Sequence, residues 1–121
     1  GAEAAIAWAY NHLGMPYIWG SSGPNGFDCS GFVKAAYGAA GVSLPHGSTV
    51  QYHATSRVSL SNIRRGDILF YSSNGSLSGM YHVAIYLGNG QVIQSVSDRS
   101  SPGTKVTHMN HTPGLFAAGR P

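Results

Sequence analysis

Residues 82–97 carry the feature that most constrains how this chain can fold. Two apolar segments, HVAIYLG at 82–88 and QVIQSVS at 91–97, are separated by the dipeptide Asn89-Gly90. Both residues of this dipeptide tolerate a positive φ, which the favoured two-residue hairpin turn requires. We therefore expect an antiparallel hairpin here. Because an isolated hairpin is only marginally stable in water, the rest of the chain is expected to extend it into a larger sheet.

Further strands are expected on both sides of this hairpin. The segment 68–71, ILFY, follows the polar turn RRGD and is typical of a strand. The segments 105–109 and 115–118 are flanked by Pro and Gly residues and are expected at the edges of the sheet. The C-terminal half of the chain therefore predicts an antiparallel sheet.

The N-terminal half of the chain favours helices. An alanine-rich segment at 3–12 predicts a helix, since it is followed by Gly14 and Pro16, which end helices. The segment 20–27, GSSGPNGF, is typical of an irregular loop because it holds three Gly, one Pro and one Asn.

Two more helices are expected after this loop. One starts at Cys29, with Asp28 as its N-cap, and continues through the alanine-rich segment that follows. A shorter one is expected at 50–54, capped by Ser48 or Thr49. With helices first and strands second, the 121 residues predict one α+β domain, residues 1–121, in which N-terminal helices pack on a C-terminal antiparallel β-sheet.

Composition excludes several kinds of protein. The one cysteine cannot form an internal disulfide or a multi-cysteine zinc site, and no segment is long and apolar enough to span a bilayer. The net charge is +3, but the basic residues form no run beyond Arg64-Arg65, so we interpret them as surface residues and expect no nucleic-acid partner. No metal and no other cofactor is predicted. Because the chain starts at Gly1 without a signal-like segment, we expect a domain excised from a longer protein.

Cys29 has two interpretations. A lone cysteine on an alanine-rich helix is often a buried apolar residue. Its polar neighbours Asp28 and Ser30, and its position after a glycine-rich loop, instead favour a thiol that a substrate can reach. Unpaired N–H groups at a helix start stabilise a thiolate, so this position predicts a lowered thiol pKa and a nucleophile.

Six histidines compete for the role of general base. His82 is favoured because it opens the first strand of the hairpin and is therefore held rigidly. His46 stays open, whereas the other four have the surroundings of surface or turn residues: His12, His53, His108 and His111.

A third polar residue is expected to orient His82. Gln94, on the second hairpin strand, can accept a hydrogen bond from one ring nitrogen and leave the other free as the base. An unbroken ladder from the turn places Ile85 opposite Gln94, so the contact with His82 requires a bulge or a longer turn. Asp98 is the alternative third residue.

Five blocks of the sequence resemble the NlpC family of bacterial cell-wall cysteine peptidases. They follow the family's order over nearly the whole chain: PYIWG (16–20), FDCSGFV (27–33), LPHGSTVQ (44–51), RRGDILFY (64–71) and HVAIYLGNGQVIQ (82–94). The resemblance implies a papain-like fold, secretion to the cell wall, and a monomer without cofactor. It also implies hydrolysis of peptidoglycan stem peptides through an acyl-enzyme, between D-glutamate and a diamino acid such as diaminopimelate or lysine.

The resemblance also implies roles for single residues. Cys29 matches the nucleophile, His82 the base and Gln94 the third polar position. The Gly pair usual after Trp is Gly20-Ser21 here, and the basic residue often found after Leu-Pro is a histidine, so the substrate preference is expected to differ in detail. Four residues are expected to bind substrate: Tyr17, Asp28, Ser30 and His46.

Two other functions stay open. Relatives of this architecture perform amidase and acyl-transfer reactions, and a wall-binding module can keep the fold without catalysis. The presence of both Cys29 and His82 favours an enzyme over a binding module.

Overall fold

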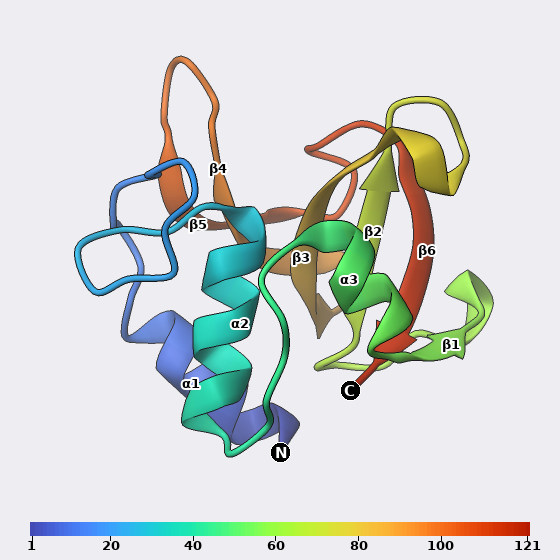
Figure 1. Ribbon diagram of the computed structural model, residues 1–121, viewed down its shortest axis with the longest axis horizontal. Helices are drawn as coiled ribbons and strands as arrows, with labels where there is room; N and C mark the ends of the chain where they lie inside the picture. Colours follow the sequence, from blue (N-terminus) through green and yellow to red (C-terminus); the bar gives the residue numbers. More distant parts are fainter.

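The computed structural model describes all 121 residues, which form three short α-helices and one six-stranded sheet (Figure 1). The predicted α+β fold, with N-terminal helices packed on an antiparallel sheet, is confirmed. The helices are α1 (Ala2–Tyr10), α2 (Cys29–Ala39) and α3 (Ser48–His53), with 3₁₀ turns η1 (Leu60–Asn62) and η2 (Leu77–Gly79). The strands are β1 (Ser56–Val58), β2 (Ile68–Ser72), β3 (Met80–Gly88), β4 (Gln91–Val96), β5 (Gly103–His108) and β6 (Leu115–Arg120).

The strand order is β1-β6-β2-β3-β4-β5, and every neighbouring pair is antiparallel. β5 lies at an edge, as predicted. The prediction of an edge strand at 115–118 is wrong, because β6 lies between β1 and β2. β1 was not predicted, since its three residues, SRV, carry no apolar alternation. It covers the outer side of β6 through backbone pairing, such as that of Arg57 with Gly119.

The larger part of the core lies between the sheet and the helices. In Figure 1, α1 and α2 run side by side next to the sheet, and α2 and α3 both contact β3. Alternate residues of the central strands, among them Ile68, Phe70 and Ile85, are fully buried in the same cluster as Ile6 and Phe32. Fully burying one such side chain stabilises the fold by about 1.5–3 kcal/mol. None of the helices is long and apolar enough to cross a membrane.

Two helix ends differ from the sequence-based expectation. α1 ends at Tyr10, and residues 11–14 form a turn instead of a last helical turn. The predicted hydroxyl cap of the third helix is wrong: α3 starts at Ser48, and its N-cap is Gly47, which has no side chain to accept a hydrogen bond. The φ of 136° at Gly47 explains why a glycine stands there, since L residues rarely adopt this conformation.

The start of α2 is confirmed at Cys29, with Asp28 as its N-cap. The Asp28 carboxylate accepts a hydrogen bond from the backbone N–H of Gly31, at 2.7 Å. The preceding loop lies directly on this first turn. A Cβ at Gly31 would lie 2.0 Å from the backbone oxygen of Ser21, so only glycine allows the loop to approach so closely.

The hairpin of β3 and β4 is confirmed, with Asn89 and Gly90 as its turn. Their φ values are 54° and 77°, as this turn type requires. The ladder contains a bulge between Tyr86 and Gly88, so Ile85 pairs with Ile93 and not with Gln94.

The bulge changes the side of the sheet on which Gln94 lies. Side chains alternate between the two faces of a strand, so a shift of one residue exchanges the faces. Without the bulge, Gln94 would share the face of Ile85, towards the helices. With it, Gln94 lies on the face that carries His82.

Replacing Gly31 by Ala should destabilise the fold by about 3 kcal/mol, because the added methyl group collides with the backbone of the loop. Gly38→Ala, in the same helix, is the matched control. A Cβ at Gly38 meets nothing within 4 Å, so this change should be neutral or should stabilise by up to about 1 kcal/mol. Denaturant unfolding of both variants measures the difference, and equal stabilities would contradict the close approach of the loop.

Candidate functional site

Two pockets meet at Cys29. The first, called the His82 pocket, has a volume of about 200 Å³, and the second, called the Asp28 pocket, about 430 Å³. Three residues line both pockets: Tyr17, Cys29 and Tyr81. The His82 pocket is completed by His82, Val96, Ser97, Asp98, His111, Thr112 and Pro113, and the Asp28 pocket by Trp19, Asp28, Ser30, His46, Gly47, Ser48 and Met80.

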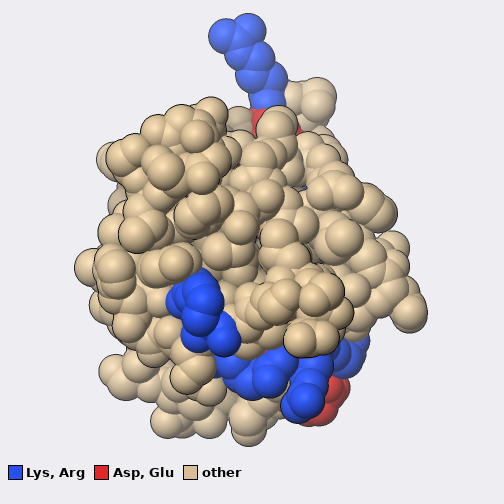
Figure 2. Space-filling model, turned by 90° about the vertical axis from the view of Figure 1, so that its right-hand side faces the viewer, with Lys and Arg blue, Asp and Glu red and all other residues tan.

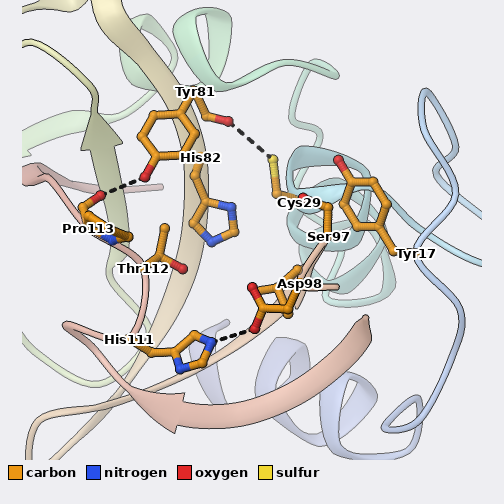
Figure 3. Close-up of a pocket in the computed structure, with 10 residues that line it drawn as sticks. Tyr17, Cys29, Tyr81, His82, Ser97, Asp98, His111, Thr112 and Pro113 are labelled. Atoms are coloured by element: carbon orange, nitrogen blue, oxygen red, sulfur yellow. Dashed lines mark hydrogen bonds and ion pairs between the residues drawn. The ribbon is translucent and has the colours of Figure 1, made fainter. Parts of the chain in front are cut away.

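The Cys29 thiol lies at the N-terminal end of α2, between this helix and β3. Figure 3 shows its sulfur directed towards the backbone oxygen of Tyr81, the residue before His82, and both Cys29 and His82 line the pocket. The thiol is 3.9 Å from the backbone oxygen of Tyr81, to which it can donate a weak hydrogen bond. A thiol that donates a hydrogen bond carries its proton, so this contact belongs to the protonated form of Cys29.

The predicted lowering of the thiol pKa is wrong. Burial raises the pKa of the Cys29 thiol above its ordinary value, and the Asp28 carboxylate raises it further. Backbone N–H groups of Val83, Ser30 and Cys29 itself act in the opposite direction but do not outweigh burial. The backbone N–H groups at the helix start thus lower the thiol pKa as expected, but the loss of hydration on burial raises it by more.

His82 projects from β3 and is almost fully buried, with 6% of its surface exposed. Its Nε2 atom lies 2.7 Å from Oε1 of Gln94. Because an amide oxygen only accepts, Nε2 must carry the proton. In the neutral ring, Nδ1 is then the unprotonated nitrogen and can act as a base.

Burial also lowers the pKa of His82. The hydrogen bond that His82 donates to Gln94 and the charge of Asp98 act to raise its pKa, and His111 acts to lower it. The net direction is downwards, so His82 is neutral at neutral pH. Thiol and imidazole are therefore both uncharged in the resting site.

Asp98, the alternative partner of His82, is engaged elsewhere. Its carboxylate accepts a hydrogen bond from Nε2 of His111 at 2.6 Å, and Lys105 lies 3.8 Å away (Figure 3). His111, expected to be an ordinary surface or turn residue, lines the His82 pocket instead. Nothing local in the sequence shows this, because the chain from β5 to β6 brings His111 back over β3. No group of three or more His, Cys, Asp or Glu side chains is placed to hold a metal ion.

The four residues expected to bind substrate all line the Asp28 pocket. Asp28 holds this pocket together: Oδ1 accepts a hydrogen bond from Nε2 of His46 at 2.8 Å, and Oδ2 accepts one from the backbone N–H of Gly20 at 3.0 Å. Asp28 and Ser30 are buried, with 6% and 5% of their surfaces exposed. Of these four residues, Tyr17 and His46 are therefore the ones whose side chains are partly exposed in the pocket.

Sequence reasoning gave no individual role to three further residues of the cleft, although the segment 77–81 was expected to form a wall that shapes specificity. Trp19 is 86% exposed at the rim of the Asp28 pocket, where Met80 also contributes. Tyr81 lies between the two pockets, and its hydroxyl donates to the backbone oxygen of Pro113 at 2.7 Å. The available signals were the position of Trp19 two residues after Tyr17 and that of Tyr81 directly before His82.

Arginines line a separate groove of about 420 Å³. Figure 2 shows most basic side chains of one face gathered in a band across its lower part, apart from a basic side chain that projects at the top of the view. Arg120 is held by Asp67 at 2.8 Å, and the Arg57 guanidinium lies 3.5 Å from the ring centre of Tyr52. The groove, lined in part by Arg57, Arg64 and Arg120, shares no residue with the pockets at Cys29.

Comparison with known proteins gives consistent matches. The model of the NlpC/P60 family matches residues 14–113. "Probable endopeptidase p60" of Listeria innocua is 48% identical over 92 residues, which are 76% of this chain but only 19% of that protein, so the chain spans about a fifth of this relative.

Two solved structures are similar over nearly their whole length. The NlpC/p60 domain of the peptidoglycan hydrolase SagA has a TM-score of 0.84 at 34% identity, covering 100% of this chain and 99% of that one. RipD of Mycobacterium tuberculosis, described as a non-catalytic NlpC/p60 domain protein adapted to peptidoglycan binding, has a TM-score of 0.82 at 28% identity, covering 98% and 95%. The fold is thus shared by a hydrolase and by a binding protein.

Alkylation of Cys29 by iodoacetamide should have its midpoint at a higher pH in the folded protein than in the unfolded one, because burial raises the thiol pKa. The same chain in guanidinium chloride is the control, with a midpoint near the ordinary value of about 8.5. Alkylation rates measured from pH 5 to 10 give both curves. A folded-state midpoint below the unfolded one would show a preformed thiolate and contradict the raised pKa.

Proposed function

Because the chain belongs to the NlpC/P60 family, we propose that it is a peptidoglycan hydrolase, a cysteine endopeptidase that cleaves stem peptides. One observation carries the proposal: the Cys29 thiol and the His82 ring, which is hydrogen-bonded to Gln94, line the same pocket. A nucleophile, a base and a group that orients the base are the parts that acyl transfer needs.

In the first step, Nδ1 of His82 takes the proton of the Cys29 thiol while the sulfur attacks the amide carbon of the substrate. Both groups are neutral at rest, so charge separates only as the attack begins. The developing oxyanion accepts hydrogen bonds from the backbone N–H of Cys29 at the start of α2 and from the Tyr17 hydroxyl. Burial, with Cys29 and Asp28 nearby, raises the pKa of Tyr17, which keeps this hydroxyl protonated as a donor.

In the second step, protonated His82 gives its Nδ1 proton to the departing amine, and the carbon–nitrogen bond breaks. The acyl group remains on Cys29 as a thioester. Water then attacks this thioester, with His82 accepting the water's proton and returning a proton to the sulfur. The products are a peptide acid and a peptide amine, and Cys29 and His82 are regenerated.

The two pockets suit the two halves of the substrate. A general acid must reach the departing nitrogen, and His82 lines only one of the pockets. The leaving half therefore occupies the His82 pocket, and the acyl half occupies the Asp28 pocket beside Tyr17 and His46.

The bond proposed to be cut joins D-glutamate to a diamino acid, and the proposed place of action is the cell wall outside the membrane. The family match and SagA, a peptidoglycan hydrolase, support a peptidoglycan substrate in general. The particular bond is proposed from the resemblance of the sequence blocks to the family. Defined stem peptides that differ only at the diamino position, analysed by mass spectrometry after incubation, identify the bond and the preferred residue. The same spectra distinguish hydrolysis from an amidase reaction and from acyl transfer.

Replacing Cys29 by Ala should abolish the release of soluble fragments from purified peptidoglycan, because no other thiol exists in the chain. His82→Gln should have the same effect, whereas His53→Gln, on the exposed side of α3, should retain wild-type activity. Wall binding of each variant is measured in parallel by cosedimentation. Undiminished release by Cys29→Ala would refute the proposed nucleophile, and binding without release by the wild type would favour a binding module like RipD.

Hydrolysis should decrease only below about pH 6.5, the ordinary pKa of histidine. His82 must be neutral to accept a proton, and burial lowers its pKa, so the acid limb of kcat/KM shifts to lower pH. Rates from pH 4 to 8, together with an NMR titration of the His82 ring, measure this shift. An acid limb above pH 6.5 would contradict the assignment of buried His82 as the base.

A further inference from the structure

We propose that Thr107 is a positioning residue that fixes the tautomer of His82 by holding the amide of Gln94 in one orientation. The inference rests on the proposed function only in assigning His82 as the base. It is carried by a chain of hydrogen bonds that starts at His82 and crosses β4 to β5.

The donor–acceptor distances along this chain are those of ordinary hydrogen bonds. Nε2 of His82 and Oε1 of Gln94 are 2.7 Å apart, and Nε2 of Gln94 is 2.9 Å from Oγ1 of Thr107. The Thr107 hydroxyl is in turn 2.9 Å from the backbone oxygen of His108. His82 and Gln94 are buried, with 6% and 1% of their surfaces exposed, so water competes little for the bond between them. The bond from Gln94 to Thr107 is partly buried, and the bond from Thr107 to His108 is exposed.

Strand pairing places Thr107 where it can reach Gln94. Thr107 on β5 pairs with Val92, two residues before Gln94 on β4. Residues two apart on a strand lie on the same face, so Thr107 is a diagonal neighbour of Gln94 on the face that carries His82. Lys105, directly opposite Gln94, is 3.8 Å from Asp98 and is directed elsewhere.

The direction of the bonds follows from the hydroxyl. A threonine hydroxyl has one proton, and Thr107 donates it to the backbone oxygen of His108. Its oxygen must therefore accept from Gln94, so the NH₂ group of the amide faces Thr107 and the amide oxygen faces His82. This arrangement requires the proton on Nε2 of His82 and leaves Nδ1 free.

The reversed amide has the opposite effect on the ring. The NH₂ group of Gln94 would then face Nε2 of His82, which would have to accept, and the proton would move to Nδ1. Nδ1 could then no longer act as a base. Reversal also requires Thr107 to give up its bond to His108, so the hydroxyl makes the reversed state less stable. Without that hydroxyl, the two orientations of the amide become more nearly equal.

Thr107→Val keeps the β-branched shape and removes only the hydroxyl. We expect kcat for a defined stem peptide to decrease about twofold with KM unchanged, because equal populations of the two amide orientations leave about half of the molecules with Nδ1 free. Thr107→Ser restores the hydroxyl and should retain nearly the wild-type kcat. NMR nitrogen shifts of the His82 ring should show the proton on Nε2 in the wild type and in Thr107→Ser, and a mixture of tautomers in Thr107→Val.

The two readouts separate failure of the inference from failure of the proposed function. The tautomer is measured without substrate, so it tests Thr107 even if no stem peptide is cleaved. Thr107→Val with the proton still confined to Nε2 would overturn the inference, as would equal loss of kcat in the Val and Ser variants. Thermal unfolding of each variant identifies a general loss of structure. If Thr107→Val loses structure, Thr107→Ser decides the question: the inference then requires the wild-type kcat and the wild-type tautomer in this variant.

Discussion

The carboxylate of Asp28 is the constraint on which the site depends. It is buried, so its oxygens need hydrogen-bond donors, and these donors come from the loop before α2, from the first turn of α2 and from His46. One group thus fixes where α2 starts, how the loop lies on it and where the wall of the Asp28 pocket stands. The thiol of Cys29 is placed by the same bonds, because it is the next residue along the chain. The absence of a side chain at Gly31 is part of the same constraint, since the loop could not otherwise approach.

A second constraint acts on the other side of the cleft, through the register of the hairpin. Gln94 reaches His82 only because the bulge before Gly88 exchanges the faces of the two strands. The same register places Thr107 beside Gln94 on the next strand. The two halves of the cleft are thus set by different physics: a buried charge orders the helical side, and strand register orders the sheet side.

Local signals in the sequence predicted most of this arrangement. The Asn89-Gly90 turn, the N-cap at Asp28 and the helix start at Cys29 each depend on neighbours within a few residues, and each is where it was expected. The positions of strands and side chains relative to distant parts of the chain were predicted less well. The inner place of β6 requires the unpredicted strand β1, and the approach of His111 to the cleft requires pairings between distant segments. The thiol pKa was predicted in the wrong direction because the helix start is local, whereas the burial that outweighs it comes from the whole fold.

The neutral resting state explains why an amide is sufficient as the third residue. A carboxylate in place of Gln94 would stabilise the imidazolium of His82 and so favour a preformed ion pair with the thiolate. Gln94 supplies no charge, so its contribution is orientation and choice of tautomer. An amide, however, can present either its oxygen or its nitrogen to the ring, which a carboxylate cannot. A site that uses glutamine therefore needs a further group to select one face of the amide, and in this fold the hydroxyl of Thr107 is the group in hydrogen-bonding contact with the amide nitrogen.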